Sequence, residues 1–357
     1  MKTYSKFLVI NFIKSLIYVT LILFGLIVIL NVLGELEFFK KIKISSYFPI
    51  YLAILNAPSF IFEMFPFIFI IATQLFFLNI FEDNQIQIFK YSGLKNSKIV
   101  GIIGVSTLVI SIFLIFFFYN MSSSLKSYYL ELKLKYTADG KYLAVITNNG
   151  LWIKDVVGKN IYIINASKIN ENILIDAFIT KFDSEYNVIQ NIKTKKIDIQ
   201  NNNWIIYDPY IFQENQKNKL DKIIINSNFN YEKIKSMFSN LSSLSLIELI
   251  KLKKNYDALN YSSTDVQVQI HKLVSYPLFL TIMTILSSII MFNSKTLKSN
   301  PLKLVFGLFI SVFIYYINNF FYVLGNTEKI SILVSVWMPL IILLSISILY
   351  LRKINEK

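Results

Sequence analysis

The sequence predicts a polytopic α-helical membrane protein, with six transmembrane helices arranged three and three around one inserted all-β, jellyroll-like domain. Three observations predict this class. Apolar residues make up 54% of the chain and charged residues only 16%, whereas soluble domains carry about 25% charged residues. Six segments are long and apolar enough to cross a bilayer. One long polar segment, in which apolar residues recur with a period of two, separates the third span from the fourth.

The composition also excludes other classes of protein. A soluble chain of 357 residues would form about two domains of roughly 150 residues each, but such domains could not hide this much apolar surface. Disordered chains are poor in aliphatic and aromatic residues, and 10 Gly with 7 Pro exclude a collagen-like chain. Zero Cys excludes disulfides, thiolate metal sites and cysteine nucleophiles. The net charge of +14 indicates either nucleic acid or anionic lipid as a partner.

The six spans follow from length, because about 20 apolar residues at 1.5 Å per residue cross a hydrocarbon core of roughly 30 Å. Glu63 is the one charged residue within them. The first span is longer than the apolar region of a signal peptide and no small-residue cleavage site follows it, so we expect it to be retained. The spans are 15–34, 55–81, 99–125, 273–294, 304–327 and 330–351.

The polar insert changes from helical to strand periodicity. Its short β-branched and aromatic runs, separated by Asn- and Gly-rich turns, are typical of a sandwich or jellyroll-like domain, which we place at 126–244. Ser245 and Glu248 form a capping box that begins a short amphipathic helix, 246–254, in a connecting segment, 245–272. The predicted strands are 142–147, 150–155, 160–164, 172–179, 196–200, 204–207 and 222–225.

The distribution of Lys and Arg predicts the orientation. The flanks on the side of both termini are richer in basic residues than the opposite short loops, where Lys40, Lys41, Lys43 and Lys329 stand beside acidic residues. Both termini are therefore expected in the cytoplasm and the β domain in the periplasm, with domains at 1–125 (first three spans), 126–244, 245–272 and 273–357 (last three spans). Because the basic residues are spread over many loops rather than gathered in one patch, we expect no nucleic acid partner. The richer flanks hold Lys2, Lys6, Lys90, Lys95, Lys98, Lys295, Lys298, Lys303, Arg352, Lys353 and Lys357.

The residues needed for catalysis are missing. No glycine begins a phosphate-binding loop that ends in Lys-Ser or Lys-Thr, and His271 is the only histidine, so nucleotide hydrolysis, histidine metal clusters and Ser-His-Asp chemistry are not expected. We predict no enzyme activity, no cofactor and no metal. Glu63 either reaches the interface or pairs with a basic neighbour. His271 and Lys272, at the start of the fourth span, either anchor the helix at the interface or contact a lipid phosphate.

The cytoplasmic loop between the second and third spans holds a short amphipathic helix, 82–97. Gln85, Ile86, Ile88 and Phe89 are spaced so that the apolar residues share one side, and Gly93 ends the helix. Such a helix either lies on the lipid surface or docks to a soluble partner. In a membrane protein without its own ATPase, docking would be how energy enters.

Together these features resemble the LptF/LptG permeases of the lipopolysaccharide export machine, over essentially the whole chain. The resemblance rests on the order of several weak motifs and on the arrangement of three spans, a β domain and three spans. The motifs are Pro58-x4-Glu63-x2-Pro66, Phe89–Gly93, Gly150-Leu-Trp-Ile-Lys-Asp155 followed by Ile161-Tyr-Ile163, His271-Lys272-x4-Pro277, Tyr322–Gly325 and Trp337–Pro339. The third of these and the last two look more like LptG than LptF.

The resemblance implies a permease subunit in the bacterial inner membrane that extracts lipopolysaccharide from the outer leaflet and passes it through its periplasmic jellyroll. The implied partners are an LptF-like homologue, a cytoplasmic LptB-like ATPase dimer, and LptC-like and LptA-like periplasmic jellyroll proteins. Lys40, Lys41 and Lys43 are implied contacts for lipid phosphates. The implied coupling helix contains Glu82, Asp83, Gln85, Phe89, Lys90 and Gly93, and Gln85 stands where the family usually has Glu.

Alternative functions remain open at the level of sequence. The chain is alternatively the LptF subunit, or a membrane-anchored assembly protein whose β domain binds a periplasmic partner without transport. A permease for another lipid or for lipoprotein is disfavoured, because such permeases with large outer domains often have four spans. An intramembrane enzyme is disfavoured because one Glu and one His form no polar cluster.

Overall fold

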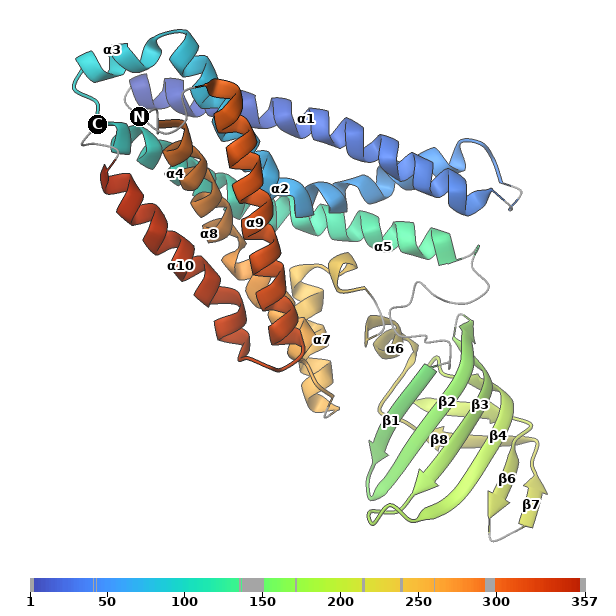
Figure 1. Ribbon diagram of the computed structural model, residues 1–357. Helices are drawn as coiled ribbons and strands as arrows, with labels where there is room; N and C mark the ends of the chain where they lie inside the picture. The colour runs from blue at the N-terminus through green and yellow to red at the C-terminus, as the bar shows by residue number, and fades with distance from the viewer. Residues whose placement is uncertain are drawn as a thin grey trace. The chain divides into compact units, whose positions relative to one another are not determined.

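The structure, a computed structural model, describes residues 3–40, 42, 44–134, 136, 151–170, 172–213, 216–237, 240–259, 261–292 and 299–353. The chain divides into two compact units, a helical unit of Met1–Lys126 with Thr264–Lys357 and a second unit of Ser127–Ser263. Figure 1 shows the helices of the first and the sheet of the second.

Six long apolar helices are present among the described residues, and they confirm the six predicted spans. The third span is continuous through three segments, because α4 passes through a π-helical stretch, η1, into α5. Short α3 lies between the second and third spans. The bounds are α1 Thr3–Phe39, α2 Phe48–Glu82, α3 Gln85–Tyr91, α4 Asn96–Phe113, η1 Leu114–Tyr119, α5 Asn120–Leu134, α8 Thr264–Phe292, α9 Asn300–Asn326 and α10 Ile332–Lys353.

Helices α2 and α8 form the core of the helical unit, and much of α1, α9 and α10 is exposed at its outside. Aromatic side chains of α2 fill the core: the Phe76 ring meets Phe12 of α1 at a centroid distance of 5.9 Å, and Phe77 meets Phe292 of α8 at 5.0 Å. Exposed apolar surface of this extent is typical of faces that contact lipid or another protein within the membrane. The outer helices therefore carry the surface that the helical unit presents to its membrane surroundings.

The start of α1 and the end of α10 lie at the same end of the helical unit as α3 (Figure 1). Phe7, near the start of α1, contacts Phe89 of α3. Phe81, near the end of α2, contacts Phe292 of α8 and lies under the ammonium of Lys303 in α9. The α1–α2 and α9–α10 turns lie at the opposite end.

The second unit is an antiparallel half-barrel, inserted between the third and fourth spans, and its presence confirms the predicted inserted β domain. The sheet order is β1-β2-β3-β4-β5-β8, and β6 pairs with both β4 and β7. Ile153, Ile164, Ile179 and Ile192 face one another in register across β1 to β4, and all four are buried. The strands are β1 Leu151–Val157, β2 Asn160–Asn170, β3 Ile173–Phe182, β4 Val188–Asp198, β5 Asn203–Tyr207, β6 Tyr210–Gln213, β7 Gln216–Lys219 and β8 Lys222–Asn226.

The segment after the sheet belongs to the same unit. It holds α6 (Tyr231–Met237), the 3₁₀ turn η2 (Leu241–Ser243) and α7 (Leu246–Ala258). The capping box is confirmed, since Ser245 Oγ accepts from the Glu248 N–H and the Glu248 carboxylate accepts from the Ser245 N–H at 2.7 Å. The predicted strand 142–147 lies outside the described residues. The sequence did not predict β6 and β7, and it predicted only the last part of β4.

Candidate functional site

The helix α3 is held at the surface of the helical unit by one aromatic contact. The Phe89 ring lies 6.2 Å from that of Phe7 in α1, whereas Ile88 is 62% exposed and Tyr91 88% exposed. The helix begins after Asn84, whose φ of 55° turns the chain sharply away from α2. The amphipathic side predicted from sequence is therefore divided between an anchored Phe89 and an exposed Ile88.

The end of α3 is fixed by a Schellman motif. The Leu94 N–H donates to the Phe89 carbonyl and the Gly93 N–H to the Lys90 carbonyl, both at 2.9 Å. Gly93 has a φ of 74°, a conformation that glycine adopts without the steric cost of a Cβ. The role of Gly93 is thus to stop α3 and direct the chain into α4.

The acidic residues expected on this helix lie just before it. Glu82 is the last residue of α2, and Asp83 caps that helix. The Gln85 side-chain amide donates to the Asp83 carboxylate at 2.9 Å. The sequence assigned 82–97 to one helix, whereas α3 covers Gln85–Tyr91 and the exposed acidic groups border it. Together with exposed Lys90, this surface can bind a partner of mixed charge and apolar character.

At the end of the helical unit opposite α3, the fold brings together three motifs that lie far apart in the sequence. The Trp337 indole N–H of α10 donates to His271 Nδ1 of α8 at 3.4 Å. The Lys272 ammonium lies over the ring of Tyr322 in α9, 5.3 Å from its centroid. Three motifs far apart in sequence therefore meet across α8, α9 and α10.

Glu63 of α2 belongs to the same region. Its exposed carboxylate acts electrostatically on both Lys126 and Lys272. The Lys126 ammonium lies 6.0 Å from the Phe60 ring centroid. Glu63, Lys126 and Lys272 thus form a small cluster of one anion and two cations contributed by different helices.

Aromatic side chains pack closely beneath these charges. The Tyr276 ring of α8 stacks on Phe62 of α2 at 4.7 Å, and its hydroxyl donates to the Phe62 carbonyl. Tyr119, in the π-helical segment η1, also packs against the Phe62 ring, with ring centroids 4.9 Å apart. These contacts join α2, which carries Glu63, to α8, which carries Lys272.

Of the three lysines expected to meet lipid phosphates, Lys40 is exposed just after the last residue of α1. Phe39 beside it packs on Phe48 of α2 with ring centroids 5.6 Å apart. Lys41 and Lys43 lie outside the described residues.

In the half-barrel, Asp155 links β1 to the chain that follows β8, the first and last strands in the sheet order. It is 2% exposed, and its carboxylate accepts from Ser227 Oγ at 2.6 Å, the Asn228 N–H at 3.1 Å and Asn228 Nδ2 at 2.8 Å. Asp155 lies in β1, whereas Ser227 and Asn228 directly follow β8. The last residue of the Gly150–Asp155 motif thus acts as a clasp across the half-barrel.

Tyr261 holds the edge of β1 near this clasp. Its hydroxyl accepts from the Lys154 N–H at 2.8 Å and donates to the Lys154 carbonyl at 3.0 Å. Burial of the ring raises the pKa of Tyr261, so the hydroxyl keeps its proton. No pattern in the sequence predicted a role for Tyr261, Ser227 or Asn228, because none of them belongs to a local motif.

Metal chemistry finds no support in the part of the chain that the structure describes, where no group of three or more His, Cys, Asp or Glu side chains is placed to hold a metal ion.

The model of a family described as lipopolysaccharide export system permease LptF/LptG matches residues 6–353. No curated protein matches the chain.

Proposed function

The chain belongs to the LptF/LptG family of lipopolysaccharide export permeases, and from this premise we propose that it is the LptG-like subunit of an ATP-driven export complex. It extracts lipopolysaccharide from the outer leaflet of the inner membrane and passes it to its own β domain. Members of this family are transport subunits rather than enzymes, so a separate cytoplasmic ATPase dimer hydrolyses ATP. An LptF-like homologue completes the membrane part.

The observation that carries this proposal is the exposed apolar surface of α3. Ile88 and Tyr91 face outward on a helix that Phe89 fixes to α1. An exposed amphipathic helix fits a groove on a soluble partner. Because α3 is tied to the first span and directly follows the second, a movement of the partner is transmitted to both spans. In the proposed orientation this end and both termini are cytoplasmic.

Lipid enters at the opposite end. Lys40, with Lys41 and Lys43, meets the phosphates at head-group height. Each buried CH₂ contributes about 0.8 kcal/mol, so extraction of one lipid costs tens of kcal/mol unless the protein replaces the lost apolar surroundings. The apolar interior of the half-barrel, lined by residues such as Ile153 and Ile179, supplies part of that replacement beyond the membrane. LptC-like and LptA-like jellyroll proteins receive the lipid.

The test uses Ile88→Asp in the intact complex. We expect the ATPase to be lost from the purified membrane complex and newly made lipopolysaccharide at the cell surface to fall at least fivefold, because a charge replaces an exposed apolar contact. Ile247→Asp is the matched control, since Ile247 of α7 is 65% exposed and Ile88 62%. Equal effects of both variants would refute docking through α3.

The assembly-protein alternative makes a different prediction for depletion of the whole chain. If the chain is a permease subunit, newly made lipopolysaccharide accumulates in the inner membrane when the chain is depleted. Normal surface delivery under depletion would refute the transport function whatever the α3 variants do.

A further inference from the structure

Helices α9 and α10 are close at their shared turn and diverge from it towards the α3 end, as Figure 1 shows. Gly325 of α9 faces Ser335 of α10 so closely that a Cβ on Gly325 would lie 2.7 Å from Ser335 Cβ. This close approach fixes the turn end. Because the helices diverge from there, a space opens between them with α8 as its floor.

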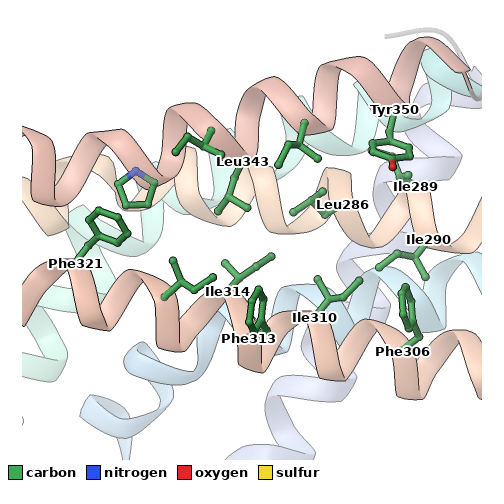
Figure 2. A pocket seen from close by; sticks show the side chains of 14 residues that line it. Leu286, Ile289, Ile290, Phe306, Ile310, Phe313, Ile314, Phe321, Leu343 and Tyr350 are labelled. Atoms are coloured by element: carbon green, nitrogen blue, oxygen red, sulfur yellow. The ribbon is translucent and has the colours of Figure 1, made fainter.

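That space is an apolar groove of about 530 Å³. Its floor is formed by Ile289 and Ile290, each less than a tenth exposed, whereas Phe306 of α9 and Ile346 of α10 are 46% and 40% exposed on its walls. Figure 2 shows side chains of both helices pointing into the gap, with Phe321 at the turn end and Tyr350 at the α3 end. The lining is aliphatic and aromatic except for the hydroxyl of Tyr350.

The dimensions select the occupant. From Phe306 to Phe321 the groove follows α9 for about 22 Å, at 1.5 Å per residue. A volume of 530 Å³ over about 22 Å leaves a cross-section of about 24 Å². A helix at least 10 Å wide needs about 79 Å², whereas a polymethylene chain about 4–5 Å wide, from carbon contact distances of 3.5–4.0 Å, needs about 13–20 Å². One hydrocarbon chain fits, and a helix does not.

The surroundings identify the source of that chain. The groove opens between α9 and α10, two helices with much exposed apolar surface, and its length exceeds the roughly 15 Å of one leaflet, half of a core of about 30 Å. The only polar group of the lining, the Tyr350 hydroxyl, is at the α3 end, and tyrosine is enriched at head-group level. A phospholipid leaves only one of its two acyl chains outside the groove, whereas lipopolysaccharide, with several chains, would leave more of its apolar surface outside.

We propose that this groove holds one acyl chain of a bilayer phospholipid, whose head group lies beside Tyr350 at the α3 end. The bound chain fills the space between α9 and α10 and keeps them apart. This lipid site is separate from the transported lipid and does not depend on the proposed function.

The first test places a photo-crosslinking benzophenone side chain at Ile346 or at Ile348 in the otherwise unchanged full-length chain, in membranes with radiolabelled phosphatidylethanolamine. The two residues are similarly exposed, 40% and 45%, but two positions along a helix turn a side chain by about 200°, so Ile348 meets only surrounding lipid. We expect at least fivefold more crosslinking from Ile346 after detergent extraction. Equal crosslinking at both positions, crosslinking to lipopolysaccharide instead, or crosslinking to a protein would each overturn the proposal.

The second test counts bound lipid by native mass spectrometry of the purified complex. Ile310→Trp fills the groove, and Phe309→Trp is the control because Phe309 is 75% exposed and about 100° away around α9. Retained phospholipid should fall by about one molecule per chain in Ile310→Trp alone. Retention of that molecule by a folded Ile310→Trp variant would contradict the proposal, and if this variant fails to fold the crosslinking pair decides.

Discussion

At the scale of single residues, Asp155 shows how a motif residue without catalytic chemistry is required by the fold. Strands β1 and β8 lie at the two ends of the sheet order, and the buried carboxylate connects β1 to the chain just after β8 through Ser227 and Asn228. A half-barrel without such a clasp opens easily, because its two ends are not paired as neighbouring strands.

Asp155→Ala should therefore destabilise the β domain by about 3 kcal/mol, because it leaves buried donors without their charged acceptor. Hydrogen exchange of the β1 amides in the full-length protein measures the change. Asp183→Ala is the control, since exposed Asp183 accepts within its own turn, from the Glu185 and Asn187 N–H groups and from Asn187 Nδ2. Unchanged exchange in β1 would show that Asp155 is not a clasp.

Gly93 is required for its backbone conformation rather than for space. A Cβ there would meet nothing within 4 Å, but φ is +74°. Gly93→Ala should therefore loosen α3 by about 1 kcal/mol, seen as faster hydrogen exchange in Gln85–Tyr91. Gly101→Ala is the matched control, because Gly101 is helical and its Cβ would also meet nothing within 4 Å. If both variants exchange alike, the Schellman end does not hold α3.

At the scale of elements, helix packing depends on residues whose role is visible only in three dimensions. Gly325 lets α9 approach α10 at Ser335, and Gly307 does the same for α9 against Gln74 of α2. The Gln74 side-chain amide then donates to the Lys303 carbonyl at 2.9 Å. Small residues at such crossings are the usual means of close approach between helices in membranes.

Gly325→Ala should destabilise the helical unit by about 1–3 kcal/mol through overpacking. The double variant Gly325→Ala with Ser335→Gly restores the space and should recover most of the loss. Thermal unfolding of the detergent-solubilised protein measures both, with Gly34→Ala as control because nothing lies within 4 Å of its Cβ. No recovery in the double variant would contradict the assigned contact.

The sequence predicted the elements whose signal is local. Hydropathy over about 20 residues found six spans, and the capping box found α7, because both depend on neighbours along the chain. It missed most of β4, where Lys193, Lys195 and Lys196 interrupt the apolar pattern, and the exposed hairpin β6–β7. These strands are held by pairing with neighbours rather than by their own burial pattern.

At the scale of the whole molecule, the candidate sites could be predicted only in part. The α3 surface was found because one short segment contains it. The contacts of His271 with Trp337 and of Lys272 with Tyr322 join separate helices, and no spacing rule predicts which residues meet. The lipid groove is still less visible in the sequence, since its apolar lining is identical in character to the rest of a spanning helix.

The proposed function depends most on the orientation of the whole chain in the membrane. Because the chain contains no Cys, this orientation can be tested directly with single cysteines. Single cysteines are placed at Tyr91 in α3, at Glu185 in the β3–β4 turn and at Lys329 in the α9–α10 turn, all exposed. In cells with a permeabilised outer membrane, a membrane-impermeant maleimide should label Glu185→Cys and Lys329→Cys, because both lie on the periplasmic side in the proposed topology. Tyr91→Cys should react only after the inner membrane is disrupted, because the lysine-rich flanks hold the α3 end in the cytoplasm.

The reverse pattern would place α3 out of reach of a cytoplasmic ATPase and refute the proposed coupling. Labelling of Glu185→Cys and Lys329→Cys on opposite sides would instead refute the six-span topology, because an even number of crossings from the third span to the last turn puts them together.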